Sequence, residues 1–544
     1  MKLDSRNFVT KVKPPFFETV VSCIAILLTF VAPRWWLVNA GSDDLLYVKQ
    51  ALALRSGHWL GLLQDGAGLK VPGFPVFLAF LSCVRLPLFV AIALLQIIGA
   101  FLIRRYLIEN GYKRASVRII FLFTVLNPGL FGYNNSRVIR DGFYSTLLVI
   151  CFGALLNIHT ALNTTYKKTL SRKILFPAFF VFSATFIAYT REETVVFLLF
   201  TLLFIALLFL FSARNGRAIR KTLCIGMALF LTIGLFGLCI FNLNRTTYGA
   251  GSISYIESGP LTTLINQWSR VNPVSSNPRI LISHIQREII YKNIPEIGDN
   301  SKLIEQNMKF YQNVSCSQSG VCDDVGSGWT YWGLFYAIQS PDFIGTSSDF
   351  NVEVATLSKM MSKYCLGTGN CDLNVRIPTI GAPKNLIAII GFLPIEMFRS
   401  FSQQGNGMSV PPSSGNQNNV DSFRKILPYG GPPRVLSDQK IGFGRLTYLI
   451  TLADLLFGVF SLALVVRSKL NYRKIWKAII PIYYLFAFIL FRVFVTSTIS
   501  VIGWDVSGSN YELPANILFW IFNGFLISIL LESSDAKSKR RSIL

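Results

Sequence analysis

Two adjacent carboxylates, Asp43 and Asp44, follow the first long apolar segment of the chain, within the stretch NAGSDDLLYVKQALALRSGHWLG at residues 39–61. A carboxylate can accept the proton of an attacking hydroxyl group, and a pair of carboxylates can hold a divalent cation such as Mg²⁺ or Mn²⁺. The alternative is a structural role, because acidic residues in the first turn of a helix are stabilised by the helix dipole. Ser42 or Asp43 can cap a helix that Gly57 would end, so both interpretations stay open.

Arginines lie beside carboxylates in two further stretches, GYNNSRVIRDGFYSTLLVI at residues 132–150 and YTREETVVFLLF at residues 189–200. An arginine fork binds phosphate oxygens bidentately and stabilises the charge that develops on a leaving phosphate group. Ionisable groups between two apolar segments are costly and therefore indicate a functional site, although an Arg–Glu pair that only neutralises a turn is the alternative. The candidate residues of these stretches are Arg137, Arg140, Asp141, Arg191, Glu192 and Glu193.

Three basic residues close to the acidic pair, Lys49, His58 and Lys70, could add contacts to a phosphate group. For His58, the alternative to phosphate binding is a structural role as a hydrogen-bonding side chain. Acids and arginines that gather at one membrane face suit chemistry on a lipid-linked sugar phosphate, because the anomeric carbon of such a donor lies close to the lipid headgroups. The carboxylate would accept the proton of the attacking hydroxyl group, and the cations would hold the phosphate.

The elements that must position these residues are membrane helices. The chain has 544 residues, of which 52% are hydrophobic and only 15% are charged. Apolar segments of about 20 residues are typical of transmembrane helices. The expected fold class is therefore an all-α polytopic membrane protein with about ten such helices, and an extra apolar stretch at 74–84 is too short to cross. The predicted spans are 17–37, 86–103, 119–132, 143–160, 174–190, 194–212, 222–242, 446–466, 478–496 and 512–531.

The net charge of +24 arises mainly from basic clusters in alternate short connectors between the apolar segments. The positive-inside rule predicts that these connectors and both termini are cytoplasmic, in a plasma membrane or a bacterial inner membrane. The charge is then a topology signal, and nucleic acid is not an expected partner. Val38-Asn39-Ala40 resembles a signal-peptidase site, but the long apolar segment before it favours an uncleaved anchor.

Three parts follow from this topology. Residues 1–242 form a transmembrane module whose first outer loop, 39–85, carries the acidic pair. Residues 243–445 form a large extracytoplasmic loop domain of mixed or unknown class, and residues 446–544 form the last transmembrane helices and a basic cytoplasmic tail. Paired cysteines in the outer loop predict disulfides in an oxidising compartment, with zinc ligation or free thiols as alternatives. These cysteines are Cys316, Cys322, Cys365 and Cys371.

SDDLLYVKQALALRSGHWL, followed by LKVPGFPVFLAFL, resembles the first outer loop of the GT-C membrane glycosyltransferases. That family includes the protein O-mannosyltransferase and aminoarabinose-transferase relatives and many bacterial polyprenyl-dependent enzymes. The shared pattern is an acidic pair, an aromatic residue (here Tyr47), an Ala-rich helix and a basic–Pro motif, here Lys70-Val71-Pro72-Gly73. SRVIRDGFYSTL and YTREE resemble the second acidic corner and the arginine-containing outer turn of the family. The resemblance covers roughly residues 15–215, and Asp-Asp stands where Asp-Glu is usual.

The resemblance implies an enzyme that transfers a sugar from a polyprenyl-phosphate donor to an acceptor on the outer face of the membrane, by inverting displacement. The acceptor would be a cell-surface glycan such as O-antigen, a glycolipid or a protein. Asp43 or Asp44 would be the catalytic base with Asp141 in support, and the sequence leaves open which of the two acts. No cofactor is required, and a flippase or a donor-synthesising enzyme would be a partner. Arg137, Arg140 and Arg191 would bind the phosphate. The full set of candidate substrate- or phosphate-binding residues is Tyr47, His58, Lys70, Arg137, Arg140, Arg191, Glu192 and Glu193.

Other functions share some of these features. Ten spans with one large late loop also resemble the phage-type serotype-converting glucosyltransferases. An O-antigen polymerase or ligase uses the same kind of lipid-linked substrate but would depend on arginines of the late loop, such as Arg279, Arg287 and Arg376. A transporter of lipid-linked glycans would need polar groups along a midplane pathway and paired repeats, whereas the spans look nearly free of charge. Other acyl or phosphoryl transferases complete the alternatives.

The predicted topology can be tested by labelling. Ser42→Cys, in a background whose native thiols do not react, should be modified on intact cells by a membrane-impermeant maleimide, because the first outer loop faces outward. Ser538→Cys, in the basic tail, should react only after the cells are permeabilised. Labelling of Ser42→Cys that also needs permeabilised cells would contradict the topology.

Overall fold

The computed structural model describes residues 16–32, 43–131, 137–163, 170–193, 197–206, 216–372, 387–395, 417–427, 472–502 and 513–541, except positions 200, 204, 278, 320, 346, 348 and 392. Their regular structure is helical; no β-strand occurs among them, and Val271 and Cys371 form an isolated antiparallel bridge.

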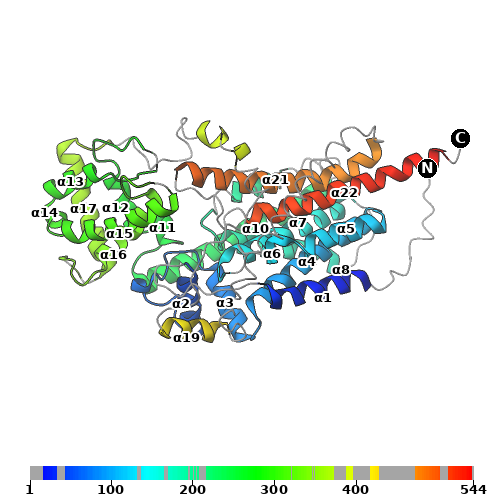
Figure 1. The fold of residues 1–544 in the computed structure, drawn as a ribbon, viewed down its shortest axis with the longest axis horizontal. Coiled ribbons are helices and arrows are strands. Elements are labelled where there is room, and N and C mark those ends of the chain that lie inside the picture. Colours follow the sequence, from blue (N-terminus) through cyan, green and yellow to red (C-terminus); the bar gives the residue numbers. More distant parts are fainter. Residues whose placement is uncertain are drawn as a thin grey trace.

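The elements follow one another along the chain as shown in Figure 1. They are α1 (Phe16–Val31), α2 (Asp43–Arg55), the 3-10 helix η2 (Leu63–Asp65), α3 (Gly73–Cys83), α4 (Leu88–Glu109), α5 (Arg114–Val125), α6 (Pro128–Phe131), α7 (Arg140–Asn163), α8 (Leu170–Ala188), α10 (Gly216–Tyr248), α11 (Tyr255–Ser258), α12 (Pro260–Trp268), α13 (His284–Asn293), α14 (Pro295–Gly298), α15 (Ser301–Ser319), α16 (Ser327–Ile338), α17 (Phe350–Thr368), α19 (Gln417–Ile426), α21 (Tyr472–Ile502) and α22 (Leu513–Arg541).

Five helical segments are long and apolar enough to cross a membrane, which indicates an integral, multi-pass membrane protein. Shorter apolar helices overlap the predicted spans that begin at 17, 174 and 512, and α3 matches the short stretch at 74–84. The predicted span 446–466 lies outside the described residues, and 194–212 is described only in part. The count of ten therefore stays a prediction. The five segments are Leu88–Glu109, Arg114–Phe131, Arg140–Leu162, Ile219–Tyr248 and Pro481–Val501.

Helix α7 forms the centre of the bundle, where it packs against α4, α8 and α22. Gly99 on α4 and Gly153 on α7 let the two backbones approach closely: a Cβ atom at Gly153 would lie 2.8 Å from the Cβ of Leu102. Asn157 of α7 then donates a 2.7 Å hydrogen bond to the carbonyl of Leu102. Small residues and interhelical hydrogen bonds replace the hydrophobic driving force that is absent between helices in lipid.

Residues 249–372 build a separate helical domain at the other end of the molecule from the bundle (Figure 1). Its own apolar core includes the fully buried Trp268, Ile290 and Phe335. The described part of the predicted loop domain, whose class the sequence left open, is thus helical. Helix α10, which precedes this domain, continues to Tyr248.

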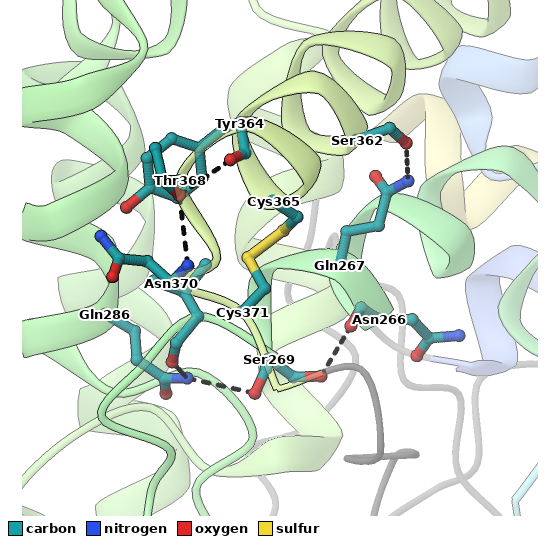
Figure 2. Close-up of a disulfide and its surroundings, with 11 residues drawn as sticks. Asn266, Gln267, Ser269, Gln286, Ser362, Tyr364, Cys365, Thr368, Asn370 and Cys371 are labelled. Carbon is teal, nitrogen blue, oxygen red and sulfur yellow. Dashed lines mark hydrogen bonds between the residues drawn. A yellow bond between two sulfur atoms is a disulfide. The ribbon is translucent and has the colours of Figure 1, made fainter.

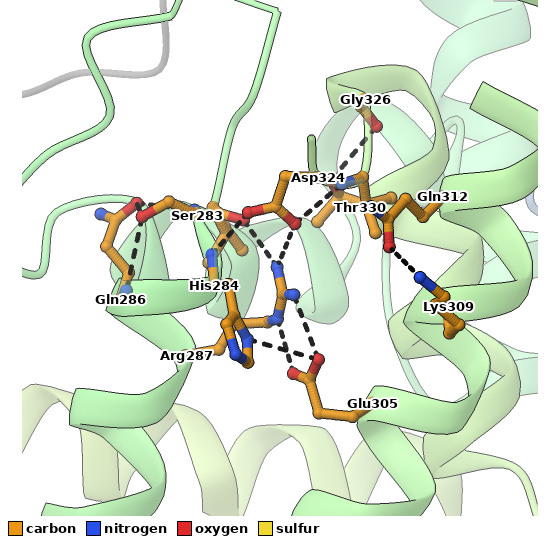
Figure 3. A network of polar contacts seen from close by, with 12 residues as sticks. Ser283, His284, Gln286, Arg287, Glu305, Lys309, Gln312, Asp324, Gly326 and Thr330 are labelled. Atoms are coloured by element: carbon orange, nitrogen blue, oxygen red, sulfur yellow. Dashed lines mark hydrogen bonds and ion pairs between the residues drawn. The ribbon is translucent and has the colours of Figure 1, made fainter. Parts of the chain in front are cut away.

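A polar network organises one side of this domain (Figure 3). Arg287 of α13 lies at its centre, with its Nε atom 2.7 Å from Glu305 of α15 and its Nη1 atom 2.9 Å from Asp324. The Arg287 side chain is almost fully buried. Asp324 also accepts a 2.5 Å hydrogen bond from the backbone N–H of His284. The network joins α13, α15 and the segment that precedes α16.

The first outer loop is part of the interface with this domain. Leu60, Ala67 and Leu69 belong to the domain's apolar core. The backbone N–H of Tyr255 donates to the carbonyl of Gly68 at 3.0 Å, and the Ser254 hydroxyl donates to that of Leu69 at 2.8 Å. These bonds hold the chain immediately before Lys70.

Both pairs of outer cysteines form disulfides, and the connectivity is local, Cys316–Cys322 and Cys365–Cys371. Figure 2 shows the second, which joins Cys365 in the last turn of α17 to Cys371 just after the helix. Beside it, the N–H of Asn272 donates to the carbonyl of Asn370 at 2.9 Å. The disulfide and this bond attach the end of α17 to the segment after α12.

Removal of this disulfide should destabilise the outer domain. Cys365→Ser combined with Cys371→Ser frees a short loop in the unfolded chain, which should lower the free energy of unfolding by about 2 kcal/mol. The measurement is the thermal unfolding of the purified protein in detergent. Cys224→Ser with Cys239→Ser, at two free thiols of α10, is the control and should leave the transition unchanged. Equal transitions for both variants would contradict the prediction.

Candidate active site

Acidic and basic side chains from five separate segments converge where α2, α3, α7 and α8 meet. The segments are the start of α2, the segment before α3 that carries Lys70, residues 137–141 at the start of α7, the turn after α8 and the middle of α21. Each acid lies within 4.0 Å of a base. We call this set the acid–arginine cluster: Asp43, Asp44, Asp141, Glu192 and Glu193 with Lys70, Arg137, Arg140, Arg191 and Arg492.

Asp44 is the most enclosed acid of the cluster. Its carboxylate is fully buried and forms a fork with Arg137, at 2.5 Å from Nη2 and 3.3 Å from Nε. The backbone N–H of Val138 donates a further bond to Asp44, at 3.2 Å. Burial raises the pKa of the Asp44 carboxyl, and the Arg137 guanidinium offsets this only in part. Because both oxygens are engaged, Asp44 ties α2 to the start of α7.

Asp43 faces outward instead. Its side chain is 38% exposed. Its carboxylate lies 3.8 Å from the amino group of Lys70, which is an ion pair but too long for a hydrogen bond. Of the two acids that the sequence could not separate, Asp43 is therefore the one that a solvent-borne group can reach.

Glu192 and Arg140 form a second buried pair. Nη1 of Arg140 lies 2.7 Å from the carboxylate, and its guanidinium lies 5.9 Å from the centre of the Tyr47 ring. Burial raises the pKa of Glu192, but Arg140 and Lys70 outweigh that effect and lower the pKa to about 2. Glu192 is therefore ionised at every physiological pH, and its charge holds Arg140 in place.

Arg191 binds two acids at once. Its Nη1 atom donates to Asp141, and its Nε atom donates to Glu193 at 2.9 Å. Burial raises the pKa of Glu193, but Arg191 and then Arg492 reverse that effect and lower it. The turn after α8 is thus attached to the start of α7 by ion pairs with almost no exposure to solvent.

Arg492 of α21 is the member of the cluster that sequence reasoning missed. It is fully buried, with Nη1 2.5 Å from Glu193. The guanidiniums of Arg191 and Arg492 lie 5.5 and 5.0 Å from the centre of the Tyr144 ring. A single arginine within the apolar run FILFRVFV was the available signal, because an intramembrane charge needs a partner. The prediction that the spans are nearly free of charge did not take this arginine into account.

Gly73, in the Lys-Val-Pro-Gly motif, fixes the turn that carries Arg191. Its N–H would be unsatisfied at the start of α3, but it donates to the carbonyl of Tyr189 at 2.7 Å. A Cβ atom at Gly73 would lie 2.3 Å from that carbonyl oxygen, closer than any side chain can approach. Tyr189 in turn donates to the carbonyl of Ile233 on α10 at 2.5 Å. The glycine is required by close backbone contact.

The remaining predicted residues lie at different distances from the cluster. Tyr47 is buried below Arg140, and its ring packs edge-on against Phe74 at 5.2 Å. Lys49 pairs with Asp65 at 2.8 Å instead. His58 is exposed beyond the far end of α2, where its backbone N–H donates to the carbonyl of Ala53 at 2.9 Å. Ala53 itself is ten residues from Asp43, or about 15 Å along the helix. The structure does not bring His58 to the cluster.

Among the residues that the structure describes, no group of three His, Cys, Asp or Glu side chains could hold a metal ion. The oxygens of Asp44 already accept bonds from Arg137 and Val138. A divalent ion at the acidic pair therefore stays a prediction.

The chain matches no protein-family model and no curated protein. What the structure establishes is a helical, multi-pass membrane protein with a disulfide-containing helical domain. The resemblance to the GT-C enzymes rests on short motifs and stays an inference from them.

The buried chain of ion pairs can be tested through stability. Arg492→Met leaves Glu193 with one cation, and breaking a buried pair in this way should lower the free energy of unfolding by about 3–5 kcal/mol. Combining it with Glu193→Gln should cost less than the sum of the two single variants, because both remove the same interaction. The measurement is unfolding of the purified protein in detergent.

Arg424→Met provides the matched control. Arg424 pairs with Asp421 on the surface of α19, and an exposed pair contributes at most about 1 kcal/mol. A loss for Arg492→Met no larger than that of the control would contradict a structural role for the buried pairs.

Proposed function

We propose that this protein is a membrane glycosyltransferase, which moves a sugar from a polyprenyl-phosphate donor to an acceptor at the outer surface of the plasma membrane. The acceptor is a surface glycan, a glycolipid or a protein. The observation that supports this most is the acid–arginine cluster, in which one reachable carboxylate, Asp43, lies beside cations at an end of the helix bundle. A lipid-phosphate donor would present its reacting carbon at that depth.

The proposed orientation places the helical domain outside the cell. Two disulfides suit an oxidising compartment. Helix α1 begins and α22 ends at the side of the bundle away from this domain (Figure 1). Both observations agree with the distribution of basic residues, which assigns the termini to the cytoplasm.

Asp43 is the proposed general base. It would accept the proton of the acceptor hydroxyl while that oxygen bonds to the anomeric carbon, and the bond from this carbon to the phosphate oxygen would break. The electron pair leaves with the polyprenyl phosphate, and one displacement inverts the anomeric configuration. The geometry favours Asp43 over Asp44 for this role, since a base must reach the proton that it takes. Asp44 is fully buried and engaged by Arg137.

Lys70 and Arg137 are the proposed phosphate contacts. Arg137 is 23% exposed, whereas Arg140, Arg191 and Arg492 are almost fully buried. The positive and negative charges of the cluster balance, so an entering phosphate would share these two cations with Asp43 and Asp44. The three enclosed arginines would then maintain the shape of the site.

The polymerase or ligase alternative assigned the main role to arginines of the late loop. Arg287 is enclosed by Glu305 and Asp324 (Figure 3), and Arg279 donates to the carbonyl of Ser500 at 2.9 Å. Both contacts suit structural roles. Arg376 lies outside the described residues. These placements favour the acidic pair as the site of chemistry.

Substitution of each aspartate separates the two roles. Asp43→Asn should lower sugar transfer by about 10²–10⁴-fold, because it removes the base. Thermal unfolding should change little, because the ion pair that is lost, with Lys70, is 3.8 Å long and partly exposed. Asp44→Asn should lower the unfolding temperature, because it leaves Arg137 without its buried partner. Transfer is measured by mass spectrometry of the surface glycan from cells in which each variant replaces the native protein.

Asp421→Asn, at an exposed pair on α19, is the control and should leave both transfer and unfolding unchanged. Full transfer by Asp43→Asn, at a normal protein level, would rule out the proposed base. A surface glycan that is identical with and without the gene would rule out the proposed function for that class of acceptor.

A further inference from the structure

Five aromatic side chains of α15 and α16 form a contiguous set in the outer domain, which we call the aromatic face. Tyr311 lies at its centre, with its ring centroid 6.0 Å from that of Trp329 and 6.3 Å from that of Tyr336, and both pairs of planes are nearly parallel. Trp332 lies 6.2 Å beyond Tyr336, and Phe310 lies 5.0 Å from Tyr311.

Part of the aromatic face is open to solvent. The side chain of Phe310 is 62% exposed and that of Tyr336 is 36% exposed, whereas Tyr311 is buried between α15 and α16. Exposed side chains of Gln306 and Asn313 lie four residues before Phe310 and three after it, so they share its side of α15. An amide both donates and accepts hydrogen bonds. The surface therefore combines flat apolar rings with uncharged polar groups.

The aromatic face continues toward the candidate active site. Leu63, two residues before Asp65, packs against the apolar core that contains Phe335, the neighbour of Tyr336 in the chain. In agreement with this packing, burial and then the Asp65 carboxylate raise the pKa of Tyr336. Asp65 is paired with Lys49 of α2 at 2.8 Å, and both side chains are well exposed. Asp43 is the first residue of the same helix, six positions earlier, or about 9 Å along its axis.

We propose that the aromatic face binds the acceptor and that the acceptor is a carbohydrate chain. Sugar rings would stack their C–H faces on Phe310 and Tyr336, and the amides of Gln306 and Asn313 would bond to their hydroxyl groups. The chain would extend past Lys49 and Asp65 to bring its reacting hydroxyl group to Asp43. This inference rests on the proposed glycosyl transfer and narrows its acceptor to a glycan.

Two other occupants fit the geometry less well. A lipid surface would have to reach α15 and α16, but these helices belong to the domain at the end of the molecule opposite the helix bundle (Figure 1). A protein partner would use the rings for their apolar area and would not require amide groups beside them. A glycan uses both the flat ring faces and the amides.

Binding to the full-length protein in detergent tests the proposal. The probe is the water-soluble polysaccharide released by mild acid from membranes of the cells that carry the gene, and the readout is tryptophan emission, since Trp329 and Trp332 belong to the face. Phe310→Leu and Tyr336→Leu keep an apolar side chain but lose the flat ring, and each should weaken binding about tenfold. Phe310→Tyr and Tyr336→Phe should bind as the native protein does.

Ile285→Ala, at another exposed apolar side chain of the domain, should not change the affinity. Equal affinity of the leucine variants and the native protein, or no binding of the polysaccharide by the native protein, would overturn the proposal. Binding to phosphatidylglycerol vesicles that Phe310→Leu abolishes and the polysaccharide does not compete would assign the face to a membrane surface instead.

The variant Asp43→Asn separates the test of glycan binding from the test of the proposed reaction. The variant should bind the polysaccharide normally while it loses transfer. Normal transfer by Asp43→Asn would reject the proposed base and leave the binding result intact. Unchanged binding in Phe310→Leu, together with lost transfer in Asp43→Asn, would reject the aromatic face and leave the proposed function standing.

Discussion

A charge inside an apolar helix bundle persists only when an opposite charge lies against it, and the acid–arginine cluster is arranged around that constraint. Neither Arg191 nor Arg492 could be enclosed alone, because the desolvation of an isolated ion costs several kcal/mol even after relaxation. Glu193 lies between them and contacts both. Through these contacts and the pair of Arg191 with Asp141, α21, the turn after α8 and the start of α7 hold one another in position at this end of the bundle.

The same constraint separates framework from reactivity. Acids enclosed by arginines, such as Asp44 and Glu192, have little freedom to exchange partners with a substrate. Asp43 lies at the edge of the cluster, where its pairing with Lys70 is long and solvent reaches it. In such a site the one carboxylate that solvent can reach lies at the edge of a set of buried ion pairs whose charges cancel. Because the charges of the cluster balance, a negatively charged ligand must compete with the carboxylates for the cations. A ligand that also binds through an apolar lipid chain would therefore be favoured.

The outer domain is connected to this site through the backbone of the first outer loop. Gly68 and Leu69 bond to the start of the domain, and Lys70 and Gly73 follow at once, the latter in contact with Tyr189. Four residues thus link the domain, the cluster and the turn that carries Arg191. Lys70 is therefore held by backbone contacts on both sides, to the domain before it and to the turn after α8 behind it.

The sequence by itself determined the membrane class, the positions of most of the apolar helices, the cysteines that could form disulfides and the charged residues at the helix ends. Those properties depend on composition and on short spacings, which can be read from neighbouring residues. Only the tertiary structure decided that Asp44 is enclosed by Arg137 while Asp43 is reachable, and that Arg492 belongs to the cluster. Arg492 and Glu193 are 299 positions apart, and their pairing follows from how distant helices pack, which no local pattern records.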